Sequence, residues 1–173
     1  MRNWRPVHQA SDSRVGPRPS FGDGVSPEGP AAPAGTVEEH FLGLAAHSTA
    51  ALGSMAAQLR AAAEMRLEPR IRQAIALRVA ELNGCARGLC PAIEGAAPPD
   101  AATLRRYRLG LADDPREQVL LALTTKLVED RGHHTRCAVE AARQLGATDE
   151  EIVEVVALVG LHTFANYLQS VVG

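Results

Sequence analysis

A long segment with almost no charge, at the end of the chain, sets the strongest limit on the fold. It opens with a capping box, in which Thr148 and Glu151 stand three residues apart, and continues as IVEVVALVGLHTFANYLQSVV. The predicted helix is apolar around most of its circumference, so we expect it to lie in a hydrophobic core or in a subunit interface. We expect no apolar run of the chain to be long enough to span a bilayer.

The sequence from Val37 onward predicts one helix after another. Apolar residues recur at helical spacing, and we find no alternating pattern bounded by hairpin turns. Proline and aspartate at predicted first turns, and glycine after predicted last turns, divide the chain into segments. The predicted helical segments are 48–65, 68–84, 101–109, 116–130, 135–145 and 149–172. We therefore expect an all-α domain over residues 37–173.

Residues 1–36 have a different composition. Residues 1–35 hold six of the eleven prolines and five of the fifteen glycines. A segment of this composition cannot bury enough apolar surface to offset the entropy that it would lose on ordering. This segment is predicted to be a flexible arm, with Trp4 or Phe21 available to dock onto a partner subunit. The chain start has no apolar signal region, which predicts a cytoplasmic protein.

Charge and composition exclude several classes of function. A net charge of −2 without a basic cluster, and 3% aromatic residues, argue against nucleic acid as the main partner. Three cysteines do not make a disulfide scaffold, so we expect reduced thiols or a reactive one. No cofactor is predicted. Cys85, Cys90, His133 and Cys137 have the donor types of a structural zinc site, but the Cys-x4-Cys spacing is loose, and we expect no metal and a core position for Cys137.

The order of elements around RIRQAIALRVAELNGC resembles the carboxymuconolactone decarboxylase and alkyl hydroperoxidase D (AhpD-like) superfamily. The resemblance covers roughly residues 38–173, and the turn Asn83-Gly84-Cys85 after the central helix is its most specific feature. It implies an oligomeric helical bundle, a trimer or a hexamer. In the hydroperoxidase branch a cysteine pair reduces peroxides and a dithiol partner protein re-reduces the pair.

The motif of that branch is only partly present. It has a glutamate twelve residues before the first cysteine, followed by Cys-x-x-Cys-x-x-x-His. Here Cys85 matches the first cysteine, but Gln73, Gly88 and Ala92 replace the glutamate, the second cysteine and the histidine. The glutamate and histidine would relay a proton from the attacking thiol, because an undissociated thiol is a poor nucleophile.

A second alignment inserts two residues and keeps a thiol pair. Cys90 then becomes the second cysteine, and Glu94 takes the place of the histidine. Glu81, one helical turn before Cys85, is a substitute base, and His162 of the closing helix is a substitute imidazole. The structural alternatives are thiols without redox function, a solvated or Arg78-paired Glu81, and a hydrogen-bonded core histidine.

Three functions stay open at this point. The first is a thiol-dependent peroxidase with an altered site, in which Cys85 and Cys90 are the redox thiols. The second is a non-redox decarboxylase or isomerase that uses the same pocket. The third is a structural or regulatory relative that has lost its chemistry, as the residues at positions 73, 88 and 92 suggest.

Overall fold

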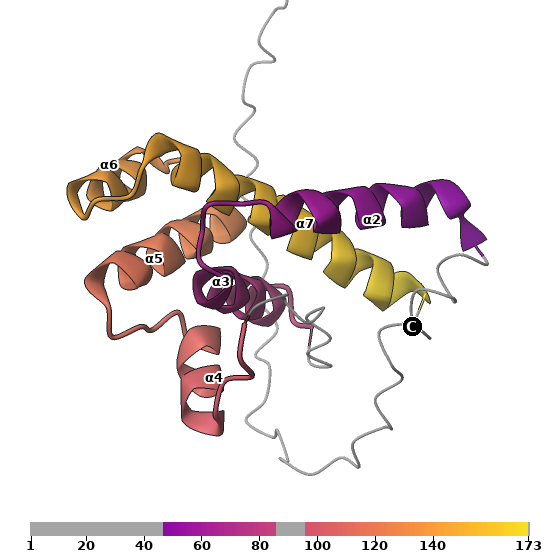
Figure 1. Cartoon of the computed structure of the whole chain (residues 1–173), viewed down its shortest axis with the longest axis horizontal. Coiled ribbons are helices and arrows are strands. Elements are labelled where there is room, and N and C mark those ends of the chain that lie inside the picture. The colour runs from indigo at the N-terminus through magenta and orange to yellow at the C-terminus, as the bar shows by residue number, and fades with distance from the viewer. Residues whose placement is uncertain (1–46, 86–95, 173) are drawn as a thin grey trace, which may run out of the picture. The chain divides into compact units, whose positions relative to one another are not determined.

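The computed structural model describes residues 47–85 and 96–172, and most of these residues are in helices (Figure 1). No strand occurs in these two ranges, so the all-α prediction is confirmed. The helices are α2 (Thr49–Ala63), α3 (Pro69–Leu82), α4 (Ala101–Arg108), α5 (Pro115–Glu129), α6 (Arg136–Gln144) and α7 (Asp149–Val172). The arm over residues 1–36 lies outside the described residues.

Most helices begin where a side chain can cap them. Oδ1 of Asp100 accepts from the backbone N–H of Thr103 at 2.7 Å, and Oδ1 of Asp114 accepts from that of Glu117 at 2.8 Å. Thr148 and Glu151 form the predicted capping box, with reciprocal hydrogen bonds of 2.9 and 3.2 Å. Each cap satisfies backbone donors that have no partner inside the helix, which fixes the first residue of α4, α5 and α7.

The C-terminal ends of α3 to α6 share one backbone motif. The residue after each C-cap has a positive φ: 67° at Gly84, 74° at Gly110, 51° at Arg131 and 86° at Gly146. The next N–H group then reaches back to a carbonyl in the last turn, as in a Schellman motif. Three of the four positions are glycine, which adopts a positive φ without steric cost, whereas Arg131 does so at the end of α5.

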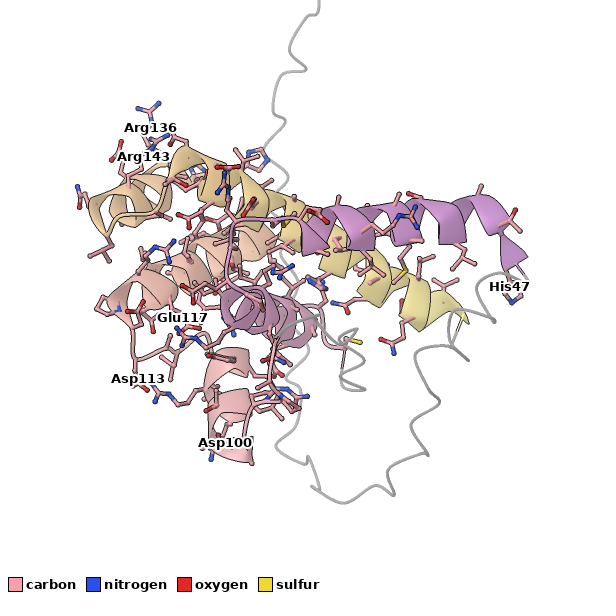
Figure 2. All side chains as sticks on the ribbon, in the orientation of Figure 1. His47, Asp100, Asp113, Glu117, Arg136 and Arg143 are labelled. Atoms are coloured by element: carbon pink, nitrogen blue, oxygen red, sulfur yellow. The ribbon has the colours of Figure 1, made fainter. Side chains whose placement is uncertain are left out.

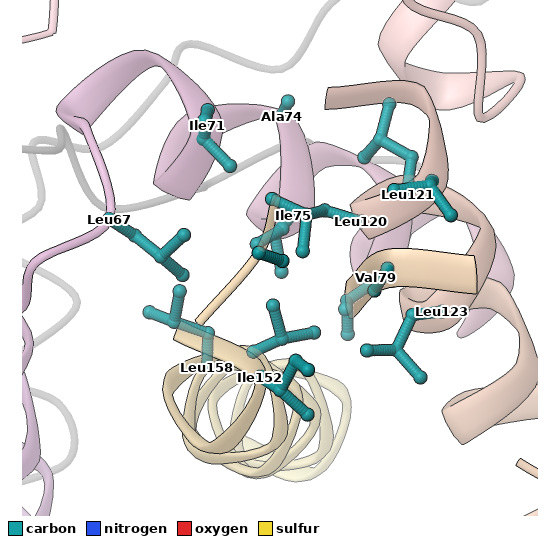
Figure 3. Packing of buried hydrophobic residues seen from close by; sticks show 14 of the residues in the cluster. Leu67, Ile71, Ala74, Ile75, Val79, Leu120, Leu121, Leu123, Ile152 and Leu158 are labelled. Carbon is teal, nitrogen blue, oxygen red and sulfur yellow. The ribbon is translucent and has the colours of Figure 1, made fainter. Parts of the chain in front are cut away.

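The hydrophobic core lies between α3, α5 and α7. Figure 3 shows that Ile75 and Val79 of α3, Leu120 and Leu123 of α5, and Leu158 of α7 converge, and all five are buried. Helix α3 therefore forms the centre of the domain, and its two ends carry the residues of the candidate sites described below.

Two polar ties hold the helices around this core. Both carboxylate oxygens of Glu154 in α7 accept backbone N–H groups of the α2–α3 connection, from Arg66 at 2.7 Å and from Leu67 at 2.8 Å. Arg78 of α3 donates to Oγ1 of Thr125 at 2.9 Å and to the carbonyl of Arg108 at 2.6 Å, and so links α3 to α5 and to the end of α4.

Helix α7 has two different faces. One face is buried and includes Ile152, Val155, Leu158 and Leu161, which confirms the expected core position of this helix. The other face is exposed, yet it carries Val153, Val156, Tyr167 and Val171.

On length and composition alone, α7 could cross a membrane over Asp149–Val171, so our expectation that no run is long enough was wrong. That property is shared by core helices of globular domains, and 44% of the apolar window is buried against this domain.

Candidate functional site

Cys85 takes its place from the turn that ends α3. Gly84 adopts the left-handed conformation, and the backbone N–H of Cys85 donates to the carbonyl of Ala80 at 2.9 Å, while that of Gly84 donates to the carbonyl of Glu81 at 3.0 Å. These two bonds complete a Schellman motif. The local sequence thus holds the thiol directly beyond the last turn of the central helix, where it is half-buried.

The side chain that meets this thiol comes from α7. Sγ of Cys85 donates to Oε1 of Gln169 at 2.9 Å, and Gln169 is only 8% exposed. Nε2 of the same amide is buried and has no hydrogen-bond partner among the described residues. A 180° rotation of the amide would exchange the two atoms, so that Gln169 can accept from the thiol or donate to the thiolate. A single neutral side chain can therefore serve both protonation states.

Gln169 belongs to a row of buried polar residues on α7. His162, Asn166 and Gln169 lie at helical positions i, i+4 and i+7, and so they share one face of the helix. His162 Nε2, Asn166 Nδ2 and Gln169 Nε2 are all buried without a partner in the described part of the chain. Buried polar atoms without partners are rare in folded proteins and recur at functional sites, because leaving them unpaired costs stability.

His162 cannot carry a proton at neutral pH. It is 3% exposed, and burial lowers its pKa from 6.5 to about 4. The α7 residue that reaches Sγ of Cys85 is Gln169, which lies about 10 Å further along the axis of α7 than His162. The imidazole is thus a neutral member of the same polar row.

Glu81 lies on the exposed side of the last turn of α3. Within the described residues no hydrogen bond joins it to Cys85, and the expected alternative partner, Arg78, bonds instead to Thr125 and Arg108. Asn83, two residues further on, donates to Oγ1 of Thr163 at 3.4 Å and ties the end of α3 to α7. Among the described residues, the side chain that bonds to the thiol therefore comes from α7 and not from α3.

Several predicted site residues lie outside the described residues: Gly88, Cys90, Ala92 and Glu94. The pairing of Cys85 with Cys90 consequently stays a prediction. Cys137 was expected in the core, but it is exposed on α6, because the packed side of that helix is formed by Ala138, Val139, Ala141 and Ala142. Among the described residues no group of three or more possible ligands is placed to hold a metal.

Gln73 lies at the other end of α3. About 13 Å of helix separates it from Leu82, and it borders a cavity of 360 Å³ together with Ala96 and Ala97. Ala96 and Ala97 therefore lie near Gln73, at the N-terminal part of α3.

An ion pair next to that cavity, between a half-exposed arginine and a buried glutamate, was not found from the sequence. Glu117 of α5 is 1% exposed, and its Oε2 accepts from Nη1 of Arg70 at 2.7 Å. Tyr107 of α4 is also buried; burial, and after it the charge of Glu117, raises its pKa, so it keeps its hydroxyl proton. Figure 2 shows Glu117 on the side of α5 that faces α3 and α4. Glu117 stands between Arg116 and Gln118 in the first turn of the predicted helix, where glutamate is common, so the local sequence carried no specific signal for this cluster.

Comparison with known proteins adds no relative to these observations. No protein-family model matches the sequence, and no curated protein is significantly similar to it.

Proposed function

We propose that this chain is a thiol-dependent oxidoreductase with an alkyl hydroperoxidase-like scaffold and an altered active site, in which Cys85 is the redox-active thiol. The observation that carries the proposal is the hydrogen bond between Cys85 Sγ and the buried amide of Gln169. The thiol is half-buried beside an amide whose N–H group can donate to a thiolate after rotation, and this donor has to offset the C-terminal end of α3, which disfavours negative charge.

The proposed step is the reduction of a hydroperoxide. The Cys85 thiolate attacks the terminal oxygen, the O–O bond breaks, and the leaving alkoxide takes up a proton to become an alcohol. The sulfenic acid left on Cys85 then condenses with a second thiol, which forms a disulfide and releases water. Cys90 is the candidate for the second thiol, and a dithiol protein would reduce the disulfide again.

The site differs from the hydroperoxidase pattern in its proton-handling groups. Gln73 cannot accept a proton, and His162 has a pKa of about 4, too low to remove a proton from a thiol efficiently at neutral pH. Glu81 and Glu94 are the remaining carboxylates near the two thiols in sequence. We therefore expect slow turnover, with Gln169 stabilising the thiolate in place of a charged relay.

The experiment is direct detection of the oxidised sulfur. The reduced protein is mixed with cumene hydroperoxide and dimedone, and the dimedone adduct is located by peptide mass spectrometry. An adduct on Cys85 is expected, and it should accumulate further in Cys90→Ser, which lacks the second thiol. The matched control is Cys137→Ser, which removes an exposed thiol on α6 and should leave peroxide consumption unchanged.

The opposite result is equally clear. If the reduced protein consumes no peroxide and Cys85 gains no adduct, the redox proposal is wrong. Peroxidase activity that appears only after Gln73→Glu, Gly88→Cys and Ala92→His are combined would show that the natural chain has lost its chemistry.

We also infer that the protein forms a homo-oligomer through the exposed face of α7. Val153, Ala157, Gly160, Phe164, Tyr167 and Val171 follow one another at spacings of 4, 3, 4, 3 and 4 residues. This spacing forms an apolar seam suited to pack against another helix, and the six seam positions carry no charge to oppose a second copy. The family resemblance favours a trimer or a hexamer.

Sedimentation velocity tests the assembly. Tyr167→Lys, at a side chain 60% exposed on the seam, should dissociate the oligomer. Leu145→Lys changes an exposed apolar residue at the end of α6 and should leave the assembly intact. A wild-type monomer at micromolar concentration would refute this interface.

A reactive thiol that is re-reduced by a dithiol protein fits a reducing compartment, and we propose that the protein is located in the cytoplasm.

A further inference from the structure

We propose that the N-terminal end of α3 and the α4 helix form a binding site for a small monocarboxylic acid with an apolar body. The site is the 360 Å³ cavity next to Arg70, together with a neighbouring cavity of 220 Å³. Arg70, Thr103 and Tyr107 border both cavities. The site does not depend on the chemistry proposed for Cys85, which lies beyond the other end of α3.

The walls of the larger cavity are mainly apolar. Ala96, Ala97, Pro98 and Pro99 form one side, and the first turn of α3 with Gln73 forms the other. Because prolines have no N–H group and a restricted backbone, this wall offers apolar surface and little competing hydrogen bonding. An apolar pocket with a few convergent polar groups is the usual form of a small-molecule site.

The polar group that would orient the ligand is the Arg70 guanidinium. One N–H group of Arg70 donates to Glu117 Oε2, and the Arg70 side chain is still 54% exposed. A guanidinium has five N–H donors in a fixed plane, so the edge that does not face Glu117 can bind a carboxylate with two parallel hydrogen bonds. Glu117, which is almost completely buried, holds Arg70 in this orientation and is a positioning residue.

The surrounding charges limit the ligand to one negative group. Glu68 also borders the larger cavity, and a second carboxylate on the ligand would meet it. Arg106, which borders the smaller cavity, is already engaged by both oxygens of Asp113 at 2.6 and 2.5 Å. A volume of 360 Å³ equals that of about twelve water molecules, so we expect a ligand of roughly ten non-hydrogen atoms.

Titration calorimetry with benzoate and hexanoate tests the site on the full chain. We expect a dissociation constant at or below about 1 mM for at least one of these acids. Benzyl alcohol and hexanol, which have the same apolar bodies without the charge, should bind at least tenfold more weakly. Adipate, which adds a second carboxylate, should also bind more weakly than hexanoate.

Two variants locate the binding. Arg70→Lys keeps a positive charge beside Glu117 but loses the bidentate geometry, and it should weaken benzoate binding about tenfold or more. Thr103→Leu adds volume at the position shared by both cavities and leaves the Arg70–Glu117 pair intact, so it should also weaken binding. Arg105→Lys, on the exposed side of α4, is the matched control and should have no effect.

The outcomes separate this proposal from the redox proposal. Cys85→Ser should bind benzoate as the wild type does, even if it has lost all reaction with peroxide. Absence of binding by both acids at 10 mM, or equal binding of acid and alcohol, would overturn the site. Unchanged binding by both Arg70→Lys and Thr103→Leu would place the ligand elsewhere and would overturn it as well.

Discussion

The thiol of Cys85 donates a hydrogen bond of 2.9 Å to Oε1 of Gln169, a residue 84 positions later in the chain. The amide oxygen accepts from the neutral thiol, and Nε2 of the same group, which has no partner among residues 47–85 and 96–172, can donate to a thiolate after the amide rotates. A hydrogen bond to a charged group contributes about 1.5–3 kcal/mol, against about 0.5–1.5 kcal/mol for a neutral one. The observed bond is made by the neutral thiol, so support for the thiolate depends on rotation of the amide, which brings its N–H group to the sulfur.

Replacement of Gln169 by leucine tests this balance. Gln169→Leu has a similar volume and cannot donate, so the reaction of Cys85 with iodoacetamide at pH 7 should become about tenfold slower, which corresponds to about 1.4 kcal/mol. The rate is measured by mass spectrometry of the Cys85 peptide. Ser170→Ala, at an exposed neighbouring position, should react at the wild-type rate. An unchanged rate in Gln169→Leu would show that the amide does not support the thiolate.

His162 should make the protein less stable in mild acid. Its pKa is about 4 when folded and 6.5 without burial, so the unfolded state binds the proton first as the pH falls. The contribution of neutral His162 to the free energy of unfolding is fully present above pH 6.5. It is lost as the pH falls from 6.5 to 4, and the total loss is about 3 kcal/mol. Urea unfolding of wild type and of His162→Gln at pH 7 and pH 4 measures it.

The variant isolates the histidine from other titrating groups. Asp113 and Glu151 also have lowered pKa values. The pKa of Asp113 is lowered chiefly by its hydrogen bond with Arg106. Burial alone would raise the pKa of Glu151, but the hydrogen bonds from Thr148 and Arg116 together outweigh it. Both lose their stabilisation on acidification in wild type and variant alike. A loss between pH 7 and 4 that is the same in both proteins would contradict the predicted role of His162.

Glu154 should matter more to stability than Glu150, one helical turn earlier in α7. Glu154→Gln keeps the shape but leaves only one oxygen for the two N–H groups of Arg66 and Leu67, so we expect a loss of about 1–2 kcal/mol in the free energy of unfolding. Glu150→Gln is the control, since its 3.7 Å ion pair with Arg66 is exposed and should contribute less than about 0.5 kcal/mol. Equal effects of the two substitutions would rule out the proposed tie between α7 and the α2–α3 connection.

Arg131→Gly should stabilise the protein. Arg131 has a φ of 51°. A left-handed conformation costs a residue with a side chain about 1–2 kcal/mol. This is more than the extra conformational entropy of about 0.5–1 kcal/mol that glycine loses on folding, so glycine is favoured at this position. We expect a gain of about 0.5–1 kcal/mol in urea unfolding. Arg105→Gly, inside the right-handed α4, should instead lower stability by about 1 kcal/mol. A loss of stability in Arg131→Gly would refute this explanation of the α5 terminus.

The identity and approximate position of each described helix could be predicted, but the details of their ends were less certain. Pro69, Asp100, Asp114 and the Thr148–Glu151 box fix helix starts through atoms within three or four residues, as the structure confirms. The stop of α5 was expected at Gly132, whereas Arg131 already adopts the left-handed conformation and Gly132, with a φ of 78°, continues it. The residue at which the helix ends depends on how its last turn packs against the rest of the domain, and the local sequence pattern does not determine this packing.

The sequence by itself determined that the chain is helical, that α7 contributes a face to the core, and that Cys85 follows the last turn of α3. These features follow from hydrogen bonds and side-chain periodicity within one or two helical turns. Only the tertiary structure decided that Gln169 meets Cys85, that Glu117 holds Arg70, and that one face of α7 is exposed without charge. The first two relationships join residues at least 47 positions apart in the chain. The third depends on which faces of the helices meet. Both are set by the packing of the whole core and not by a local sequence pattern.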